Sequence, residues 1–179
     1  GLRYVYRNEE NFAQDRAGLE DLRELGIESR LLDGAALAAA EPALREGMAG
    51  AIEFPGDAQL RPERYTAELA RRVRELGGEV VEGVEAASLE VESGIVIGAR
   101  TVQGTERARD VIVALGPWTA NFLAAHGLKL PIQPGKGYSQ TYSKPSVLPN
   151  MPLVLREHSV CVTAWGDGFR LGSTMEFSG

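Results

Sequence analysis

The chain has 179 residues, of which 44% are hydrophobic and 25% charged, a composition that is typical of one globular domain or slightly more and excludes a disordered or fibrous protein. Its formal net charge of −6 argues against non-specific binding to nucleic acid, so we expect no nucleic-acid partner. The single cysteine, Cys161, excludes a disulfide within the chain and a cysteine-rich metal site, and we predict no metal site.

The first sixty residues alternate between strand patterns and helix patterns. Residues 2–7 suit a strand, and Asn8 can cap an amphipathic helix that we expect to continue to Gly26. After it we expect a short helix over residues 31–40, capped by Asp33, and a strand over residues 47–55.

The clearest helix in the sequence follows Pro62, a residue that suits the first helical position. Apolar side chains recur at spacings of four, four and three residues in Tyr65, Leu69, Val73 and Leu76. This spacing places them on one face and predicts an amphipathic helix that ends at the following pair of glycines.

Strand patterns dominate from residue 79 onward. The apolar run 110–115 does not alternate with polar residues, so it predicts a strand buried on both faces, as in a parallel sheet. The other expected strands are 79–84, 85–92, 95–103, 130–145, 153–155, 160–165 and 169–175. We also expect a helix that follows residues 116–119 and stops at Gly127, and a hairpin turn at 166–168. Together they predict an α+β fold in which helices cover one face of a mostly antiparallel sheet.

The residues that most often carry chemistry have plain structural interpretations in this chain. His126, at the end of a helix, and His158 are both expected to be structural, and Cys161 is expected to be a small buried hydrophobe. The glycine-rich stretches 135–137 and 166–172 lack the spacing of a phosphate-binding loop and are interpreted as turns. The glycine that ends the run 110–116 is different, because ligands of open α/β sheets bind at the carboxyl ends of strands. A ligand contact and a simple tight turn are equally compatible with that glycine.

Segment 110–118 resembles the late cofactor-domain strand of FAD-dependent oxidoreductases of the D-amino-acid oxidase superfamily, with the greatest similarity to bacterial D-amino-acid dehydrogenases. Segments 31–44, 61–80, 130–139 and 169–177 resemble further parts of the same family in the same order. The resemblance covers essentially the whole chain. It implies a substrate domain with a partial FAD-domain insertion: residues 1–60 and 127–179 as the two parts of the substrate domain, and residues 61–126 as part of the FAD-binding domain.

Two parts of the family pattern do not occur in this sequence: the Gly-x-Gly-x-x-Gly turn that binds the FAD pyrophosphate, and a later segment whose arginine grips the substrate carboxylate. Both ends also look like cuts through larger elements. We therefore expect an internal fragment of a flavoprotein, one that does not retain FAD and is inactive by itself.

The resemblance also implies positions for cofactor and substrate. It places the backbone of Val84 beside the adenine, and Ala114, Gly116 and Trp118 along the ribityl and phosphate side of FAD. Tyr138 is implied to lie near the flavin or the substrate. No catalytic residue is assigned, because the flavin supplies the chemistry in this family.

For the whole protein the resemblance implies oxidation of D-amino acids to keto acids and ammonia by hydride transfer to flavin, with an unspecified electron acceptor. It implies a cytoplasmic protein with peripheral contact at the inner face of the bacterial membrane. Two alternatives stay open: a glycine- or sarcosine-type amine oxidase of the same superfamily, and a non-catalytic binding or scaffold domain. If the strand at 111–113 lacks its neighbours, we expect the fragment to self-associate there.

Overall fold

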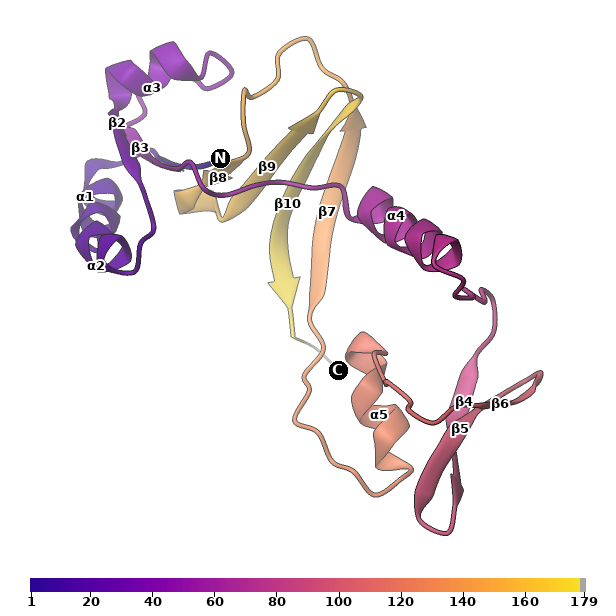
Figure 1. The fold of residues 1–179 in the computed structure, drawn as a ribbon. Helices are drawn as coiled ribbons and strands as arrows, with labels where there is room; N and C mark the ends of the chain where they lie inside the picture. The colour runs from indigo at the N-terminus through magenta and orange to yellow at the C-terminus, as the bar shows by residue number, and fades with distance from the viewer. Residues whose placement is uncertain (178–179) are drawn as a thin grey trace. The chain divides into compact units, whose positions relative to one another are not determined.

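The computed structural model describes residues 1–177, which divide into two units (Figure 1). The first unit contains residues 1–61 and 136–176, so two distant stretches of sequence fold together. The second unit contains residues 62–135 and Phe177. No helix in residues 1–177 combines the length and the apolar character that crossing a membrane requires.

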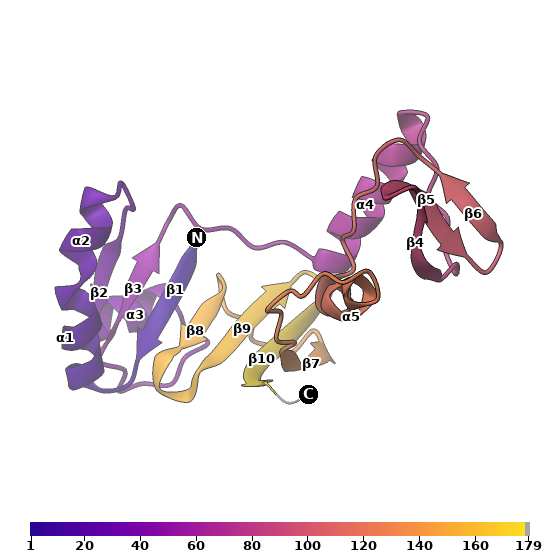
Figure 2. The same ribbon diagram turned by 90° about the horizontal axis from the view of Figure 1, so that it is seen from below.

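A seven-stranded sheet forms the first unit, in the order β2-β3-β1-β8-β9-β10-β7 (Figure 2). Only β1 and β8 pair in parallel, and the other neighbours are antiparallel, which confirms the predicted mostly antiparallel sheet. The strands are β1 (Leu2–Tyr6), β2 (Arg30–Asp33), β3 (Gly50–Phe54), β7 (Lys136–Ser143), β8 (Leu153–Leu155), β9 (Val160–Trp165) and β10 (Gly168–Glu176).

Helices cover both faces of this sheet at its β1–β3 end, whereas the sequence predicted helices on one face. Because neighbouring strand residues point to opposite faces, Val5 and Tyr6 of β1 enter two different clusters. Val5 packs with Leu37 of α3 (Gly34–Ala40), and Tyr6 packs with Phe12 of α1 (Glu9–Ala17). The helix α2 (Leu19–Glu24) follows α1, and a 3-10 turn, η2 (Arg156–His158), joins β8 to β9.

The predicted helix caps are confirmed by their hydrogen bonds. The Asn8 side chain accepts from the backbone N–H of Asn11 at 2.9 Å. In the same way, Asp33 accepts from the N–H of Ala36 at 2.8 Å. Each bond satisfies an N–H group that has no partner inside the helix.

Two predictions for this unit's helices were wrong. The helix expected to continue to Gly26 breaks at Gly18, which separates α1 from α2, since glycine has a low helix propensity. Residues 31–33, expected in a helix, belong to the edge strand β2, which pairs with β3, because the sheet offers their backbone groups partners.

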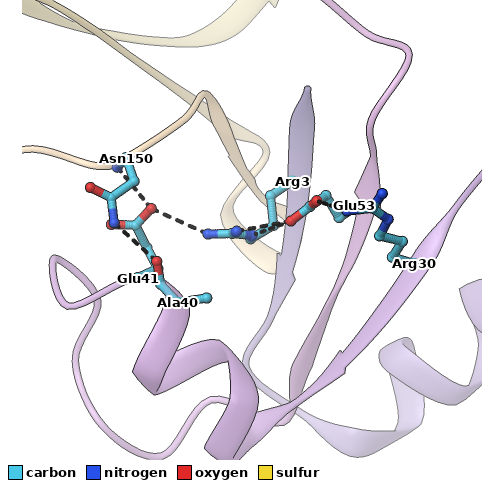
Figure 3. A network of polar contacts seen from close by, with 6 residues as sticks. All are labelled: Arg3, Arg30, Ala40, Glu41, Glu53 and Asn150. Atoms are coloured by element: carbon cyan, nitrogen blue, oxygen red, sulfur yellow. Dashed lines mark hydrogen bonds and ion pairs between the residues drawn. The ribbon is translucent and has the colours of Figure 1, made fainter.

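A buried polar network crosses the centre of the first unit (Figure 3). Arg3 is only 4% exposed, and its guanidinium lies 3.3 Å from Oε2 of Glu41 and 2.9 Å from Oε2 of Glu53. Glu41 also accepts from the backbone N–H of Asn150 at 2.9 Å. The network therefore connects β1, β3, the end of α3 and the loop before β8.

The second unit contains one long helix, a three-stranded meander and a short helical turn. Pro62 begins α4 (Pro62–Glu75), as predicted. The meander consists of β4 (Ala86–Glu92), β5 (Ile95–Thr101) and β6 (Gly104–Arg107), of which β6 was not expected. The turn η1 (Gly116–Trp118) leads into α5 (Thr119–Ala124).

The strands expected over 79–84 and 110–115 do not form, because no strand in residues 1–177 pairs with either segment. A strand needs neighbours for its backbone N–H and C=O groups, and Ile112, expected to be buried, is 90% exposed. The strand expected over 130–145 is shortened to β7, since Pro131 and Pro134 cannot donate to a ladder. The turn predicted over 135–137 is wrong in part, because the strand β7 begins at Lys136. The hairpin turn predicted near residue 166 is confirmed at Gly166 and Asp167.

Candidate functional site

The residues expected to contact the cofactor lie in the second unit. Ala114 is exposed at the end of an irregular stretch, and Gly116 and Trp118 form the two ends of η1. Val84 is half-buried in the irregular segment before β4. The structure therefore places Ala114, Gly116 and Trp118 at or next to one turn. Val84 lies in a separate segment of the same unit.

The backbone turn at Gly116 is open to an approaching ligand. Gly116 has a φ of +54°, a conformation that side chains other than glycine adopt rarely, and a Cβ atom added there would meet nothing within 4 Å. Trp118 is 72% exposed and Ile112 is 90% exposed. An open backbone turn between two exposed apolar side chains leaves room for a flavin nucleotide to approach the backbone.

Tyr138, the expected substrate residue, lies on the edge strand β7 of the first unit. Its hydroxyl donates to Oε2 of Glu176 on the neighbouring strand at 2.6 Å. This hydrogen bond, more than burial, raises the pKa of Tyr138. The phenol is therefore protonated at neutral pH and engaged with a carboxylate.

The sheet register shows which face carries Tyr138. Gln140 lies directly opposite Leu171 of β10, and Tyr138 shares its face because strand side chains alternate. Leu171 packs against the cluster that contains Val5 of β1. Tyr138 is therefore on the α3-covered face of the sheet, at the end that no helix of this unit covers.

A cavity of about 420 Å³ opens on the same side of the unit. Its walls include Arg7 and His158, which follow the carboxyl ends of β1 and β8, the one parallel strand pair within residues 1–177. Ligands in α/β folds bind beyond the carboxyl ends of parallel strands. The apolar wall is formed by Val5, Ala43, Leu44, Met48 and Leu155.

Beside its apolar wall the cavity is lined by the charged side chains of Arg7, Arg45, Glu46 and Glu157. The Arg7 guanidinium has no ion-pair partner in the described part of the chain, whereas its backbone N–H donates to Glu157 at 3.0 Å. A free guanidinium beside an imidazole is suited to a carboxylate. The arrangement can therefore accept a small molecule that carries a carboxylate and an apolar side chain.

The sequence analysis missed this cavity. Arg7 was treated only as part of a strand, and His158, expected to be structural, is exposed and lines the cavity. His126 does have a structural role, since its Nε2 accepts from the N–H of Leu89 at 3.1 Å. Cys161, expected to be buried, is exposed, because its neighbour Val162 takes the inward position on β9. A short parallel pair formed by segments 150 residues apart leaves no local signal in the sequence.

Comparisons with known proteins identify relatives of the whole chain. The chain is 31% identical to the D-amino acid dehydrogenase of Phenylobacterium zucineum over 184 aligned residues, which cover all of this chain and 43% of that protein. Glycine oxidase from Geobacillus kaustophilus superposes with a TM-score of 0.86 at 26% identity, covering 98% of this chain and 47% of that one. L-proline dehydrogenase from P. horikoshii, at 20% identity and a TM-score of 0.80 over 96% of this chain and 47% of that one, shares the fold.

The chain spans less than half the length of these relatives. The family model described as FAD dependent oxidoreductase matches residues 1–179, and that family uses FAD. The chain therefore belongs to the FAD-dependent oxidoreductase family.

Proposed function

We propose that this chain is part of a flavoprotein dehydrogenase that oxidises D-amino acids to keto acids and ammonia. The observation that carries the proposal is the 31% identity to a D-amino acid dehydrogenase along the entire chain. When bound, FAD would supply the hydride acceptor, and the protein would bind and orient the substrate.

The two units would divide this task. We propose the first unit as the substrate domain and the second as part of the FAD-binding domain, with Val84, Ala114, Gly116 and Trp118 as flavin contacts. Because the chain carries no complete phosphate-binding loop, we expect FAD to bind the isolated chain more weakly than micromolar. Equilibrium dialysis of the isolated chain against FAD measures this affinity, and micromolar or tighter binding contradicts the expectation.

On the substrate side, the residues of this chain would bind and orient an amino acid. The Arg7 guanidinium would attract the carboxylate, and the apolar wall of the 420 Å³ cavity would exclude water from the substrate side chain. Tyr138 would present a protonated phenol on the same sheet face.

A glycine- or sarcosine-type amine oxidase is the second candidate. The similarity to glycine oxidase, with a TM-score of 0.86 at 26% identity, favours it. The two candidates differ in substrate and in electron acceptor, so kinetics separates them.

The test uses the full-length protein with FAD bound. Its turnover of D-alanine, L-alanine, glycine and sarcosine is measured with an artificial dye as acceptor and with oxygen as acceptor. Dye reduction with D-alanine alone supports the dehydrogenase, and peroxide formed from glycine or sarcosine supports the oxidase. A protein that holds no flavin and oxidises none of the four contradicts both and favours a scaffold role.

An Arg7→Met variant then tests the cavity. We expect KM for the accepted amino acid to rise about tenfold with kcat nearly unchanged, since about 1.4 kcal/mol of substrate binding is lost. Arg23→Met, on exposed α2, is the matched control and should leave KM unchanged. An unaltered KM in Arg7→Met would exclude the cavity as the carboxylate site.

A further inference from the structure

The turn η2, which precedes β9, is bound to α1 through a side-chain hydrogen bond. Nε of Arg156 donates to Oδ2 of Asp15 at 2.8 Å, across 141 positions of sequence. The same oxygen accepts from the hydroxyl of Tyr6 at 2.9 Å, and Tyr6 is only 2% exposed. The hydrogen bond from Arg156 lowers the pKa of Asp15, and burial, aided by Asp15, raises the pKa of Tyr6. The lowered pKa keeps Asp15 charged at neutral pH, and the raised pKa keeps Tyr6 protonated.

The next residue of η2 is held by the beginning of α1. Oε1 of Glu157 accepts from the backbone N–H groups of Arg7 at 3.0 Å and Asn8 at 3.3 Å, and from the side-chain amide of Asn11 at 3.3 Å. Burial alone would raise the pKa of Glu157, but the hydrogen bonds outweigh it and lower the pKa overall. Arg156 and Glu157 therefore bind the two ends of one helix with side chains of opposite charge.

The residues that follow these two carry the candidate substrate cavity. His158 lines the cavity, and Ser159 has a φ of +50°, a left-handed conformation that is costly for residues other than glycine. A strained residue persists only where its surroundings fix it. The contacts of Arg156 and Glu157 with α1 supply that fixation immediately before the strained position.

We propose that Asp15 and Glu157 are positioning residues that fix η2 and thereby hold His158 in the wall of the substrate cavity. This role rests on the proposed function, because it assigns the cavity to the amino-acid substrate. Asp15 does not line the cavity and acts through Arg156. Glu157 lines the cavity and also holds the turn through its hydrogen bonds to the start of α1.

A positioning role can be separated from a purely structural one. The side chains of Arg156 and Asp15 are 49% and 29% exposed, so their ion pair adds little to the global stability of the fold. Its removal should loosen the turn locally while the two apolar clusters persist. Local exchange and substrate affinity should therefore change more than the melting temperature.

The experiment compares full-length wild type with the variants Asp15→Asn, Glu157→Gln and the double variant. Hydrogen–deuterium exchange is followed in the peptide that spans residues 156–160, and KM and kcat are measured with D-alanine. Glu9→Gln, an exposed carboxylate in the first turn of the same helix, is the control.

We expect exchange at 156–160 to accelerate at least tenfold in the double variant, and the melting temperature and the control to stay near wild type. We expect KM to rise several-fold in Asp15→Asn, whose side chain does not line the cavity, so that its effect on KM reports positioning alone. Unchanged exchange, or faster exchange with unchanged KM, overturns the proposal. If wild type oxidises no amino acid, the proposed function fails, and the exchange measurement still decides whether α1 fixes the turn.

Discussion

The two units differ in how they bury apolar surface. Every buried hydrophobic residue in the described part of the chain belongs to the first unit, where the clusters around Val5 and Tyr6 lie on opposite faces of the sheet. In the second unit α4 buries none of its residues, and its apolar face stays exposed: Tyr65 54%, Leu69 47%, Val73 43% and Leu76 74%.

This difference indicates which part of the fold is self-sufficient. The first unit packs its own apolar side chains, so its free energy of unfolding depends on contacts within the chain. The second unit relies on helix and hairpin hydrogen bonds, and it presents apolar side chains of the kind that other protein surfaces cover. Substitutions with matched chemistry in the two units should therefore have very different effects.

The largest effect is expected from Arg3→Met. Removing the buried guanidinium leaves Glu41, which is 0% exposed, as an unpaired charge, and breaking such a pair costs about 3–5 kcal/mol. Denaturant unfolding of the chain measures the loss. Arg100→Met, which breaks an exposed pair with Glu90 in the second unit, should cost at most about 1 kcal/mol. Equal losses in the two variants would contradict the comparison.

Leucine truncation tests the apolar contrast directly. Leu37→Ala empties a position that is 1% exposed and should lower the free energy of unfolding by about 2–5 kcal/mol. Leu69→Ala, on the exposed face of α4, should change it by less than about 0.5 kcal/mol. The same denaturant titration serves both, and a large loss for Leu69→Ala would show that α4 is covered in solution.

In the full-length protein, Gly116→Val tests the proposed flavin contact in the second unit. The positive φ at Gly116 makes valine strained by about 1–3 kcal/mol, and we expect flavin to be lost while the first unit remains folded. The ratio of flavin to protein absorbance and a thermal melt are measured together.

Gly94→Val is its matched control, since Gly94 also has a positive φ and open space around it in the β4–β5 turn. Gly94→Val should lower the melting temperature through the same backbone strain and leave the ratio of flavin to protein absorbance unchanged. A Gly116→Val protein that melts at a lower temperature but keeps its full flavin content would contradict a flavin contact at Gly116 and indicate a simple turn residue.

The smallest effect on stability is expected from Ile112→Glu, which tests self-association of the isolated chain. Ile112 is 90% exposed in the segment for which association was predicted, so a charge there should leave stability within about 0.5 kcal/mol and shift the chain toward monomer. Sedimentation velocity over a concentration series measures the shift. Ile95→Glu, at an exposed position of the meander, should leave association unchanged, and a wild-type chain that is already monomeric would refute the prediction.

Local chemistry determined a large part of this protein from the sequence alone. The caps at Asn8 and Asp33, the start of α4 at Pro62 and the turn at Gly166–Asp167 depend on interactions within a few residues, so the sequence predicts them directly. The family resemblance extends along the whole chain for a similar reason, because short motifs such as 110–118 keep their order.

Tertiary structure decided what local chemistry leaves open. Residues 30–33 became a strand because β3 lies beside them, and residues 110–115 did not, because no strand in the described part of the chain pairs with them. The cavity at Arg7 and His158 exists only because β1 and β8, far apart in sequence, pair in parallel. Backbone hydrogen bonds between strands and contacts between distant side chains depend on which segments meet in space, and periodicity along the chain carries no record of that.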